Sequence, residues 1–291
     1  KGYNFSTNSD TEVLLKAYIE WGVNAFDLFN GMWSLAIYNK ENNELIVSRD
    51  RFGQKPLFIS DKNNCLYFFS EPQQFHQIQK TKPNYELIRR FIREGNYNKD
   101  DRKTFFSNIE EFPKAYNLML RYNHDIKIEQ YWSYPESIER KNSNESVQEF
   151  NDLLKDAVKL RLRADVDVGL LVSGGIDSTI IASLVREESG KDKKIFAYSY
   201  SSDDKYDESR FAKVVSEKLK LNISFLKQDY NSKDYISRLK AIVKNLGRGH
   251  SSPAIISIDY LYEEARKDRL KVIIDGQGAD ELLAGYKQYF I

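Results

Sequence analysis

The sequence contains almost no cysteine and no long hydrophobic run. A single cysteine among 291 residues excludes a disulfide bond within the chain and is typical of a reducing compartment, so we expect a cytoplasmic location. No apolar run approaches the roughly 20 residues that span a bilayer, so we expect no membrane segment. Lysine and arginine (44) balance aspartate and glutamate (43) without any basic cluster, which does not favour a nucleic-acid partner.

Histidine is scarce too, and both ends of the chain look cut. The three histidines are not spaced as metal ligands, and we expect them on the surface or in turns. The chain starts at Lys1 instead of methionine and stops at Ile291 within an apolar pattern, so we expect a fragment of a longer protein. With 291 residues, 19 tyrosines and 17 phenylalanines, the chain can form two ordinary domains with well-packed cores.

Two common nucleotide-binding patterns are missing. A Walker loop needs a lysine after its glycines and a dinucleotide loop needs GxGxxG, and the chain has neither. It has instead DVDVGLLVSGGIDSTIIASLV, from Asp165 to Val185. The apolar residues 166–172 predict a buried strand, and the apolar spacing of three and four after 178 predicts a helix. The turn between them reads SGGIDS.

This order of strand, glycine turn and helix predicts an anion-binding site. The first N–H groups of a helix have no partner within it, and the helix dipole adds partial positive charge at that end. Gly174 and Gly175 allow the backbone to approach an oxyanion closely, while Ser173 and Ser178 carry hydroxyl donors. The alternative is an ordinary turn in which Ser178 is only the N-cap of the helix.

A second loop of the same character reads DGQGADELLAGY, from Asp275 to Tyr286, and follows a strand predicted over 271–275. Strands and helices alternate after residue 146, which predicts a parallel sheet with helices on both faces and ligands at the carboxyl ends of its strands. At that edge Asp177 and Asp280 are placed to hold Mg²⁺ together, because this ion prefers carboxylate and phosphate oxygens. A plain turn is the alternative for this loop.

The N-terminal half is rich in predicted strands, with helices to the sides, which indicates an α+β domain. Ser9 or Asp10 caps a helix that ends at Gly22. Cys65 falls inside a predicted strand, and we expect it to be a small buried hydrophobic residue.

The two halves are joined by a polar stretch over 135–145, which predicts a linker. The helix predicted after it, over 146–163, has an apolar face that includes Val147, Phe150, Leu153, Leu154 and Val158.

Several motifs together resemble a known family. SGGIDS resembles the pyrophosphate-binding loop of the PP-loop ATP pyrophosphatases. With GQGADELLAGY after it, and with TNSDTEVLLKAY, NGMWSLAIYN, SRDRFGQKPLF and FFSE before it, the chain resembles the glutamine-dependent asparagine synthetases. The resemblance implies a partial class II glutamine amidotransferase domain over 1–134, the linker over 135–145 and an incomplete ATP-binding synthetase domain over 146–291.

The fold class implied is α/β overall. The first domain would be a partial N-terminal-nucleophile hydrolase α+β (αββα) domain, and the second a PP-loop parallel-sheet α/β domain. The activity implied is ATP-dependent conversion of a carboxylate, that of aspartate in the family, to an acyl-adenylate that glutamine-derived ammonia then amidates. ATP and Mg²⁺ are the implied cofactors, the partners are small molecules, and a homodimer is the implied assembly.

The resemblance also assigns site residues. Asp10 matches the aspartate that holds the ammonium group of glutamine, unless it only caps its helix. The residues implied for adenosine are Leu171, Tyr198, Asp275 and Gly276. Those implied for pyrophosphate are Ser173, Gly174, Gly175, Asp177 and Ser178. Those implied for catalysis are Asp177, Asp280 and Gln277. Arg49 and Asp50 are expected to be structural residues of their loop.

The chain departs from the family in the second loop. Gln277 stands where the family has a glutamate that serves adenylation, and Asp275 stands where a serine is usual. Three alternatives to an aspartate-amidating ligase stay open. The acceptor is another carboxylate, such as a sugar acid in surface polysaccharide; the protein is a β-lactam synthetase-like adenylating enzyme; or it is a non-catalytic nucleotide-binding protein.

Overall fold

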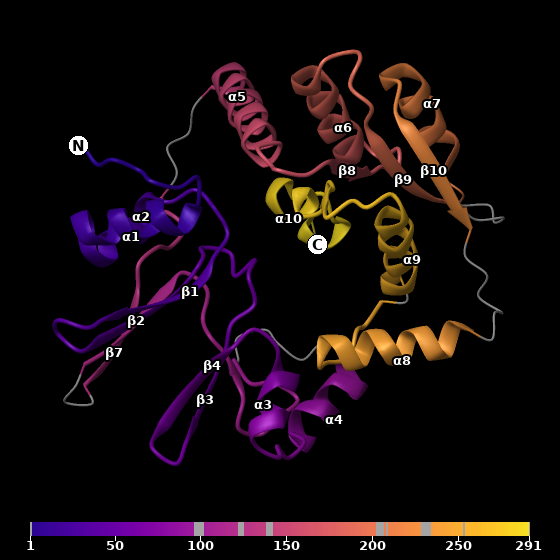
Figure 1. Cartoon of the computed structure of the whole chain (residues 1–291). Coiled ribbons are helices and arrows are strands. Elements are labelled where there is room, and N and C mark those ends of the chain that lie inside the picture. Colours follow the sequence, from indigo (N-terminus) through magenta and orange to yellow (C-terminus); the bar gives the residue numbers. More distant parts are fainter. Residues whose placement is uncertain are drawn as a thin grey trace. The chain divides into compact units, whose positions relative to one another are not determined.

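The computed structural model describes residues 2–95, 102–121, 125–137, 142–201, 207, 209–227, 234–252 and 254–290. The chain forms two compact units, one of Lys1–Ile138 with Val243–Ser251 and the other of Glu139–Ile242 with Ser252–Ile291 (Figure 1). The predicted linker over 135–145 lies partly outside the described residues, and the predicted domain borders stay predictions.

The first unit combines short helices with two antiparallel sheets. Its helices are α1 (Asp10–Trp21), α2 (Ala25–Leu28), α3 (Pro72–Ile78) and α4 (Tyr85–Glu94). Its strands are β1 (Ser34–Asn39), β2 (Glu44–Arg49), β3 (Phe58–Lys62), β4 (Cys65–Phe69), β5 (Glu110–Glu111), β6 (Tyr116–Leu120) and β7 (Ile126–Gln130). They form sheets in the orders β1-β2-β6-β7 and β4-β3-β5. The α+β class predicted for this part is confirmed.

The loop after β2 is held by two buried charged side chains. The Asp50 carboxylate is 1% exposed and accepts hydrogen bonds from the backbone N–H groups of Phe52, Gln54 and Lys55. The Arg49 guanidinium is 4% exposed, donates to three backbone carbonyls and pairs with a glutamate at 2.8 Å. Both residues are therefore structural, as the sequence predicted.

One prediction for this unit is wrong, and one of its helices was missed. Cys65 is exposed, because it closes the tight β3–β4 turn, in which Asn63 and Asn64 both have positive φ, and so lies at the end of the hairpin beyond the core. The helix α3 was not predicted; it begins with Pro72 after a capping box that Glu71 forms with Gln74.

The second unit is built on a parallel sheet. Its strands are β8 (Val168–Leu171), β9 (Phe196–Ser201), β10 (Asn222–Lys227) and β11 (Val272–Ile274), in the order β10-β9-β8-β11. Its helices are α5 (Ser143–Arg161), α6 (Ile176–Ser189), α7 (Ser209–Leu219), α8 (Asp234–Leu246), α9 (Ala254–Lys267) and α10 (Ala279–Leu283). The last residues of α8 group with the first unit. The predicted α/β class is confirmed.

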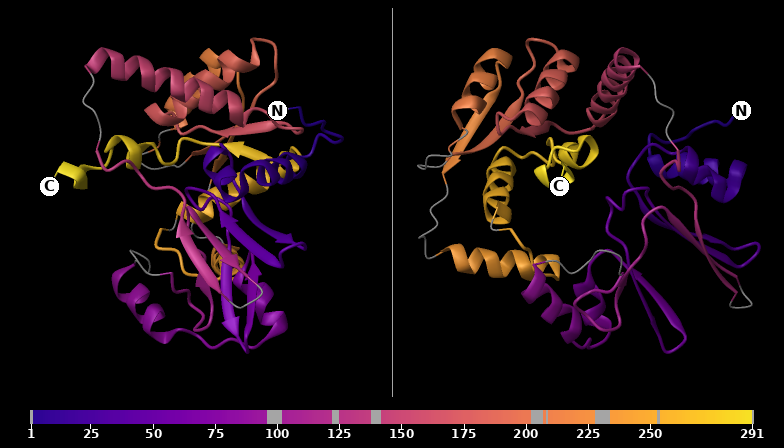
Figure 2. Two further views of the ribbon diagram at one scale, coloured as in Figure 1. Left: turned by 90° about the vertical axis from the view of Figure 1, so that its left-hand side faces the viewer. Right: turned by 180° about the vertical axis from the view of Figure 1, so that it is seen from behind.

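Helices cover both faces of this sheet, as predicted (Figures 1 and 2). Buried side chains of α5, α6 and α7 pack on one face, around Val158, Val185 and Ala212. On the other face α9 contributes Leu261 and Ala265, which pack against Tyr198 of β9. The carboxyl ends of β8, β9 and β11 consequently open to one edge, where their loops begin.

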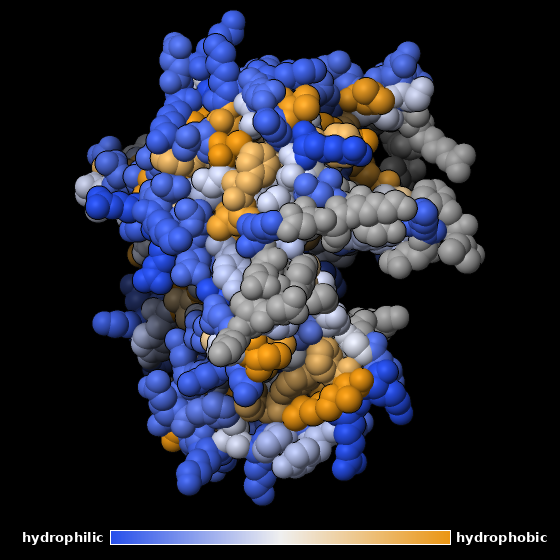
Figure 3. All heavy atoms as spheres, turned by 90° about the vertical axis from the view of Figure 1, so that its right-hand side faces the viewer, coloured by the Kyte–Doolittle hydropathy of each residue, from blue (hydrophilic) through white to orange (hydrophobic). Residues whose placement is uncertain are grey.

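The helix α5 is only partly covered. Leu154 and Leu162 pack against the core with Val158, but Val147 and Leu153 are 68% and 64% exposed, and Phe150 is exposed as well. The core therefore covers only part of the predicted apolar face, because the spacing of apolar residues defines a stripe without showing how much of it meets a neighbour. The face of the molecule drawn in Figure 3 is mainly hydrophilic, with separate hydrophobic patches. No helix within the described residues combines the length and hydrophobicity needed to cross a membrane.

Candidate active site

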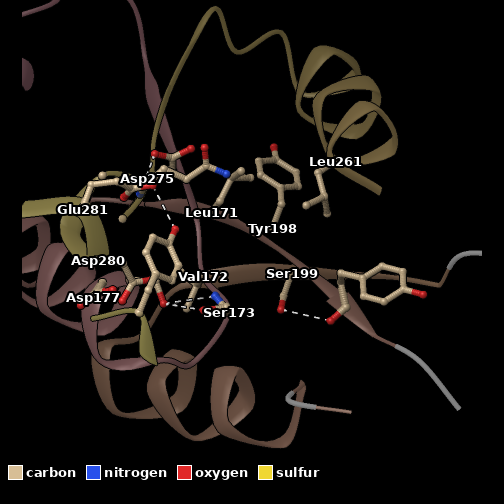
Figure 4. Close-up of a pocket in the computed structure, with 16 residues that line it drawn as sticks. Leu171, Val172, Ser173, Asp177, Tyr198, Ser199, Leu261, Asp275, Asp280 and Glu281 are labelled. Carbon is tan, nitrogen blue, oxygen red and sulfur yellow. Dashed lines mark hydrogen bonds between the residues drawn. The ribbon is translucent and has the colours of Figure 1, made fainter. Parts of the chain in front are cut away.

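The edge of the parallel sheet contains a cavity of about 520 Å³ (Figure 4). Residues from the ends of β8, β9 and β11, from the first turn of α6 and from α9 and α10 line it. They are Leu171, Val172, Ser173, Asp177, Ser178, Tyr198, Ser199, Tyr200, Leu261, Asp275, Gly276, Gln277, Gly278, Asp280, Glu281 and Tyr286. The two loops that the sequence singled out thus meet at one cavity.

The SGGIDS segment forms the turn between β8 and α6. Gly175 is the N-cap of α6, and no side chain makes a capping hydrogen bond there. The alternative to an anion site was an ordinary turn in which Ser178 is the N-cap. This alternative is wrong, because Ser178 lies inside the first turn of α6. The α6 N-terminus therefore presents backbone N–H groups that no capping side chain satisfies, which is the arrangement that binds phosphate oxygens in other proteins.

The serine hydroxyls of this turn hold the turn itself together. The Ser178 hydroxyl donates to the Gly175 carbonyl at 3.2 Å and accepts from the Ser173 N–H at 3.2 Å. The two hydroxyl oxygens lie 3.0 Å apart, and the Ser173 hydroxyl also accepts from the Gly175 N–H at 3.2 Å. The turn is thus pre-formed, and its backbone is the main source of donors for a ligand.

Two glycines are required here for packing. Gly174 has φ +87°, and a Cβ on it would lie 2.4 Å from the backbone nitrogen of Ala212 in α7. A Cβ on Gly276 would lie 2.9 Å from the backbone nitrogen of Ser178. Neither Gly174 nor Gly175 is among the described residues that line the cavity. Gly174 lets the turn fit against α7, and Gly276 lets the second loop touch the first turn of α6.

One end of the cavity is apolar. Leu171, Tyr198 and Leu261 lie there, and Figure 4 shows Tyr198 and Leu261 together, away from Asp177 and Asp280. Tyr198 is 1% exposed, and its hydroxyl donates to the Asp268 carboxylate at 2.6 Å. Burial and the bond to Asp268 raise the pKa of Tyr198, which therefore stays a neutral donor. An apolar end of this kind suits a nucleobase.

The other end is acidic. Asp177, Asp275, Asp280 and Glu281 line it together with Gln277, and the lining residues in the described part of the chain include no lysine or arginine. Within the same part, no three His, Cys, Asp or Glu side chains gather as a metal cage. The carboxylates of Asp177 and Asp280 suit a Mg²⁺ site in which the protein supplies one or two ligands. Phosphate oxygens and water complete the coordination shell in such sites.

A second cavity, of about 660 Å³, lies in the first unit. Asp10 lines it beside Asn30, Gly31, Lys55 and Ser70. Ser9 is the N-cap of α1, and its hydroxyl accepts from the Thr11 N–H at 3.2 Å, so capping does not require the Asp10 carboxylate. The carboxylate of Asp10 is therefore available for a cationic ligand.

The turn before Asp10 is fixed by Glu12. Its carboxylate accepts hydrogen bonds from the backbone N–H groups of Ser6 and Thr7. Hydrogen bonds from Lys16, Thr7 and Ser6 hold the pKa of Glu12 well below its usual range. No sequence pattern singled out this residue. We infer that Glu12 orders the turn that presents Asp10.

The site residues predicted from sequence fall in two places. Leu171, Ser173, Asp177, Ser178, Tyr198, Asp275, Gly276, Gln277 and Asp280 line the cavity of the sheet, and Asp10 lines the other cavity. The sequence did not predict the other lining residues, which are Val172, Ser199, Tyr200, Leu261, Gly278, Glu281 and Tyr286. Glu281 and Tyr286 lie within the quoted GQGADELLAGY motif, which was a usable signal, whereas nothing near Leu261 marked it. His250 groups with the first unit.

Two families match this chain. Asparagine synthase matches residues 149–291, and the glutamine amidotransferase domain matches residues 1–132. Glutamine-hydrolysing asparagine synthetase 1 of Bacillus subtilis is 30% identical over 295 residues, which cover 99% of this chain and 45% of the relative. Glutamine-hydrolysing asparagine synthetase 2 of the same organism is 29% identical over 304 residues, which cover 97% and 40%. The chain spans about half the length of the curated relatives it matches.

Among solved structures, an NH₃-dependent NAD synthetase from Campylobacter jejuni aligns with 48% of this chain and 60% of that chain, at 21% identity. The TM-score of this alignment is 0.33.

Proposed function

Because this chain belongs to the asparagine synthetase family, we propose that the protein containing it is an ATP-dependent, glutamine-hydrolysing amide ligase. One observation carries the proposal: the uncapped α6 N-terminus, an apolar end and an acidic end share one cavity. An adenine ring fits the end formed by Leu171, Tyr198 and Leu261. The triphosphate then extends towards the α6 N-terminus, between Asp177 and Asp280.

In the first step, a carboxylate oxygen of the acceptor acid attacks the α-phosphorus of ATP. The bond from that phosphorus to the bridging oxygen breaks, which gives an acyl-adenylate and pyrophosphate. The α6 backbone N–H groups and the rigid SGGIDS turn hold the departing pyrophosphate in place. Gln277, at the acidic end, is placed to orient the acceptor or the α-phosphate through its amide. Asp177 and Asp280 would hold Mg²⁺, which offsets the negative charge of the phosphates when bound.

In the second step, ammonia attacks the acyl carbon and AMP leaves. We propose that glutamine supplies this ammonia and that the cavity of the first unit binds glutamine. The Asp10 carboxylate pairs with the α-ammonium group, and Asn30 and Ser70 offer polar side chains nearby. Cys65 is not the nucleophile of this half-reaction, because it lies within the chain and so has no free α-amino group to act as its base.

Replacing Asp10 by asparagine should separate the two nitrogen sources. We expect the KM for glutamine to rise at least about tenfold, because a charge-assisted bond to the ammonium group is lost. Amide formation from added ammonium should be unchanged. Asp61→Asn, at an exposed carboxylate of β3, is the control and should leave both activities unchanged. An equal loss with glutamine and ammonium would contradict this role.

The acceptor is most simply aspartate, because the relatives are named for the synthesis of asparagine, which is the amide of aspartate. Gln277 and Asp275 favour a second candidate, an acid other than aspartate, because both stand at the acidic end of the cavity where the family pattern differs. The chemistry proposed for ATP is the same in either case.

Exchange of labelled pyrophosphate into ATP tests the function. We expect the full-length protein to show exchange that depends on an added acid and on Mg²⁺. A panel containing aspartate and several sugar acids should identify one acid that supports exchange, because adenylation is reversible and acid-dependent. If the protein bound ATP without exchange for any acid, the enzyme assignment would be wrong, and the alternative of a nucleotide-binding protein would hold.

The predicted homodimer and reducing compartment stay predictions.

A further inference from the structure

The short helix α10 places two neighbouring acids in the nucleotide cavity. Asp280 and Glu281 are consecutive residues of this five-residue helix, and both line the cavity. A helix this short has few internal hydrogen bonds, so it does not fix its side chains alone. The residues next to the helix therefore influence where the two carboxylates lie.

The chain folds back on α10 directly after it ends. Ala284 is in the left-handed conformation, with φ 56° and ψ 42°, and its N–H donates to the Asp280 carbonyl. The N–H of Gly285 also donates to the Asp280 carbonyl, at 2.8 Å. This reversal brings Gly285 and Tyr286 against the residues five positions before them.

Gly285 lies against the Asp280 carboxylate. A Cβ at position 285 would be 1.9 Å from Oδ1 and 2.8 Å from Cγ of Asp280, and 3.1 Å from its Cα. Such distances are far inside van der Waals contact, so any side chain at 285 must displace the carboxylate. Gly285 has no positive φ, and the requirement for glycine is therefore one of space.

Tyr286 contacts the other acid. Its hydroxyl donates to Oε1 of Glu281 at 3.0 Å, and its ring lines the same cavity. Figure 4 shows this bond as a dashed line to Glu281. The hydrogen bond to Glu281 raises the pKa of Tyr286, so the phenol stays a donor at neutral pH. Gly285 thus lies against Asp280, and Tyr286 contacts Glu281.

We propose that Gly285 and Tyr286 are positioning residues of the nucleotide site. Gly285 leaves free the space that the Asp280 carboxylate occupies, and Tyr286 fixes the Glu281 carboxylate by its hydrogen bond. Neither residue needs to touch the reacting atoms. This inference rests on the proposed function, which assigns Asp280 to Mg²⁺, and it adds Glu281, which lines the same cavity, to the MgATP site.

Calorimetric titration of the full-length protein with MgATP tests the inference through binding, independently of turnover. Gly285→Ala should weaken MgATP binding at least about tenfold, because its methyl group displaces a carboxylate assigned to the metal. Ala284→Gly is the matched control: it changes one methyl group at the adjacent position, outside the cavity lining, and glycine accepts the left-handed conformation there. Binding by the control should change less than about twofold.

Tyr286→Phe should weaken binding about three- to tenfold, the range expected for the net contribution of one ordinary hydrogen bond. In a Glu281→Ala background the same substitution should have no further effect, because the acceptor is already gone. A residue with a purely structural role would give additive losses in this cycle. Tyr289→Phe, a neighbouring tyrosine outside the cavity lining, should leave binding unchanged.

Raising the Mg²⁺ concentration gives a second readout. It should restore part of the affinity of Gly285→Ala, because the defect lies at the metal ligand, whereas a folding defect would not respond. Equal MgATP affinity in the wild type and Gly285→Ala, or additive effects in the cycle, would overturn this inference alone. A wild-type protein that binds no MgATP would overturn the proposed function and this inference with it.

Discussion

Replacing Asp177 by asparagine should lower pyrophosphate exchange about 10²- to 10³-fold, the loss typical of one preorganised electrostatic group in an active site. Asp177 lies in the first turn of α6 and lines the cavity beside Asp280. Asparagine keeps the shape of the side chain but removes the charge that would hold Mg²⁺. The lining residues in the described ranges include no lysine or arginine that could take over the phosphates.

The measurement is the rate of isotope exchange at saturating acid, followed at increasing Mg²⁺. Asp167→Asn is the matched control, because Asp167 precedes β8 and so lies at the opposite end of this strand from the SGGIDS turn. It should leave exchange unchanged. Exchange by Asp177→Asn at the wild-type rate would show that the carboxylate has no part in adenylation.

Among the glycine-to-alanine substitutions that we consider in the second unit, we expect Gly174→Ala to lower the free energy of unfolding most. The residue has φ +87°, and the added Cβ would lie 2.4 Å from the backbone nitrogen of Ala212. Backbone strain and a clash with main chain together predict a loss of about 3–5 kcal/mol in the free energy of unfolding of this unit. The loss should be greatest for the packing of α6 against α7.

Gly190→Ala separates strain from clash. Gly190 has a similar φ of +79°, but a Cβ there meets no atom within 4 Å, so only the strain of about 1–3 kcal/mol is expected. The three tryptophans, Trp21, Trp33 and Trp132, all belong to the first unit, so their fluorescence does not report on α6 and α7. Hydrogen exchange of α6 and α7 peptides measures the opening free energy directly. Equal losses in the two variants would contradict the role assigned to Ala212.

The parallel sheet and its two ligand loops could be predicted because their signals are local. SGGIDS follows an apolar run and precedes a helical pattern, and the acids of the second loop follow another strand. Carboxyl ends of parallel strands meet at one edge, so the loops around Asp177 and Asp280 had to converge. Nine of the sixteen residues that line the cavity were accordingly named from sequence.

Features that depend on a distant partner could not be predicted. The need for glycine at 174 comes from a backbone atom of α7, and the acceptor for the Tyr198 hydroxyl is Asp268, just beyond α9. The exposure of Cys65 follows from turn geometry, because Asn63 and Asn64 adopt positive φ and end the hairpin there. Alternation of apolar and polar residues marks a strand but does not show whether the core extends to a given position in that strand.

Hydrogen exchange with and without MgATP tests the central claim, that the turn at the start of α6 binds the triphosphate of ATP. We predict protection of the amides of residues 174–178 and 275–281 in the full-length protein, because the α6 N–H groups become hydrogen-bonded to phosphate and the second loop closes on the nucleotide. Protection confined to other peptides, with these two segments unchanged while ATP is bound, would contradict the account.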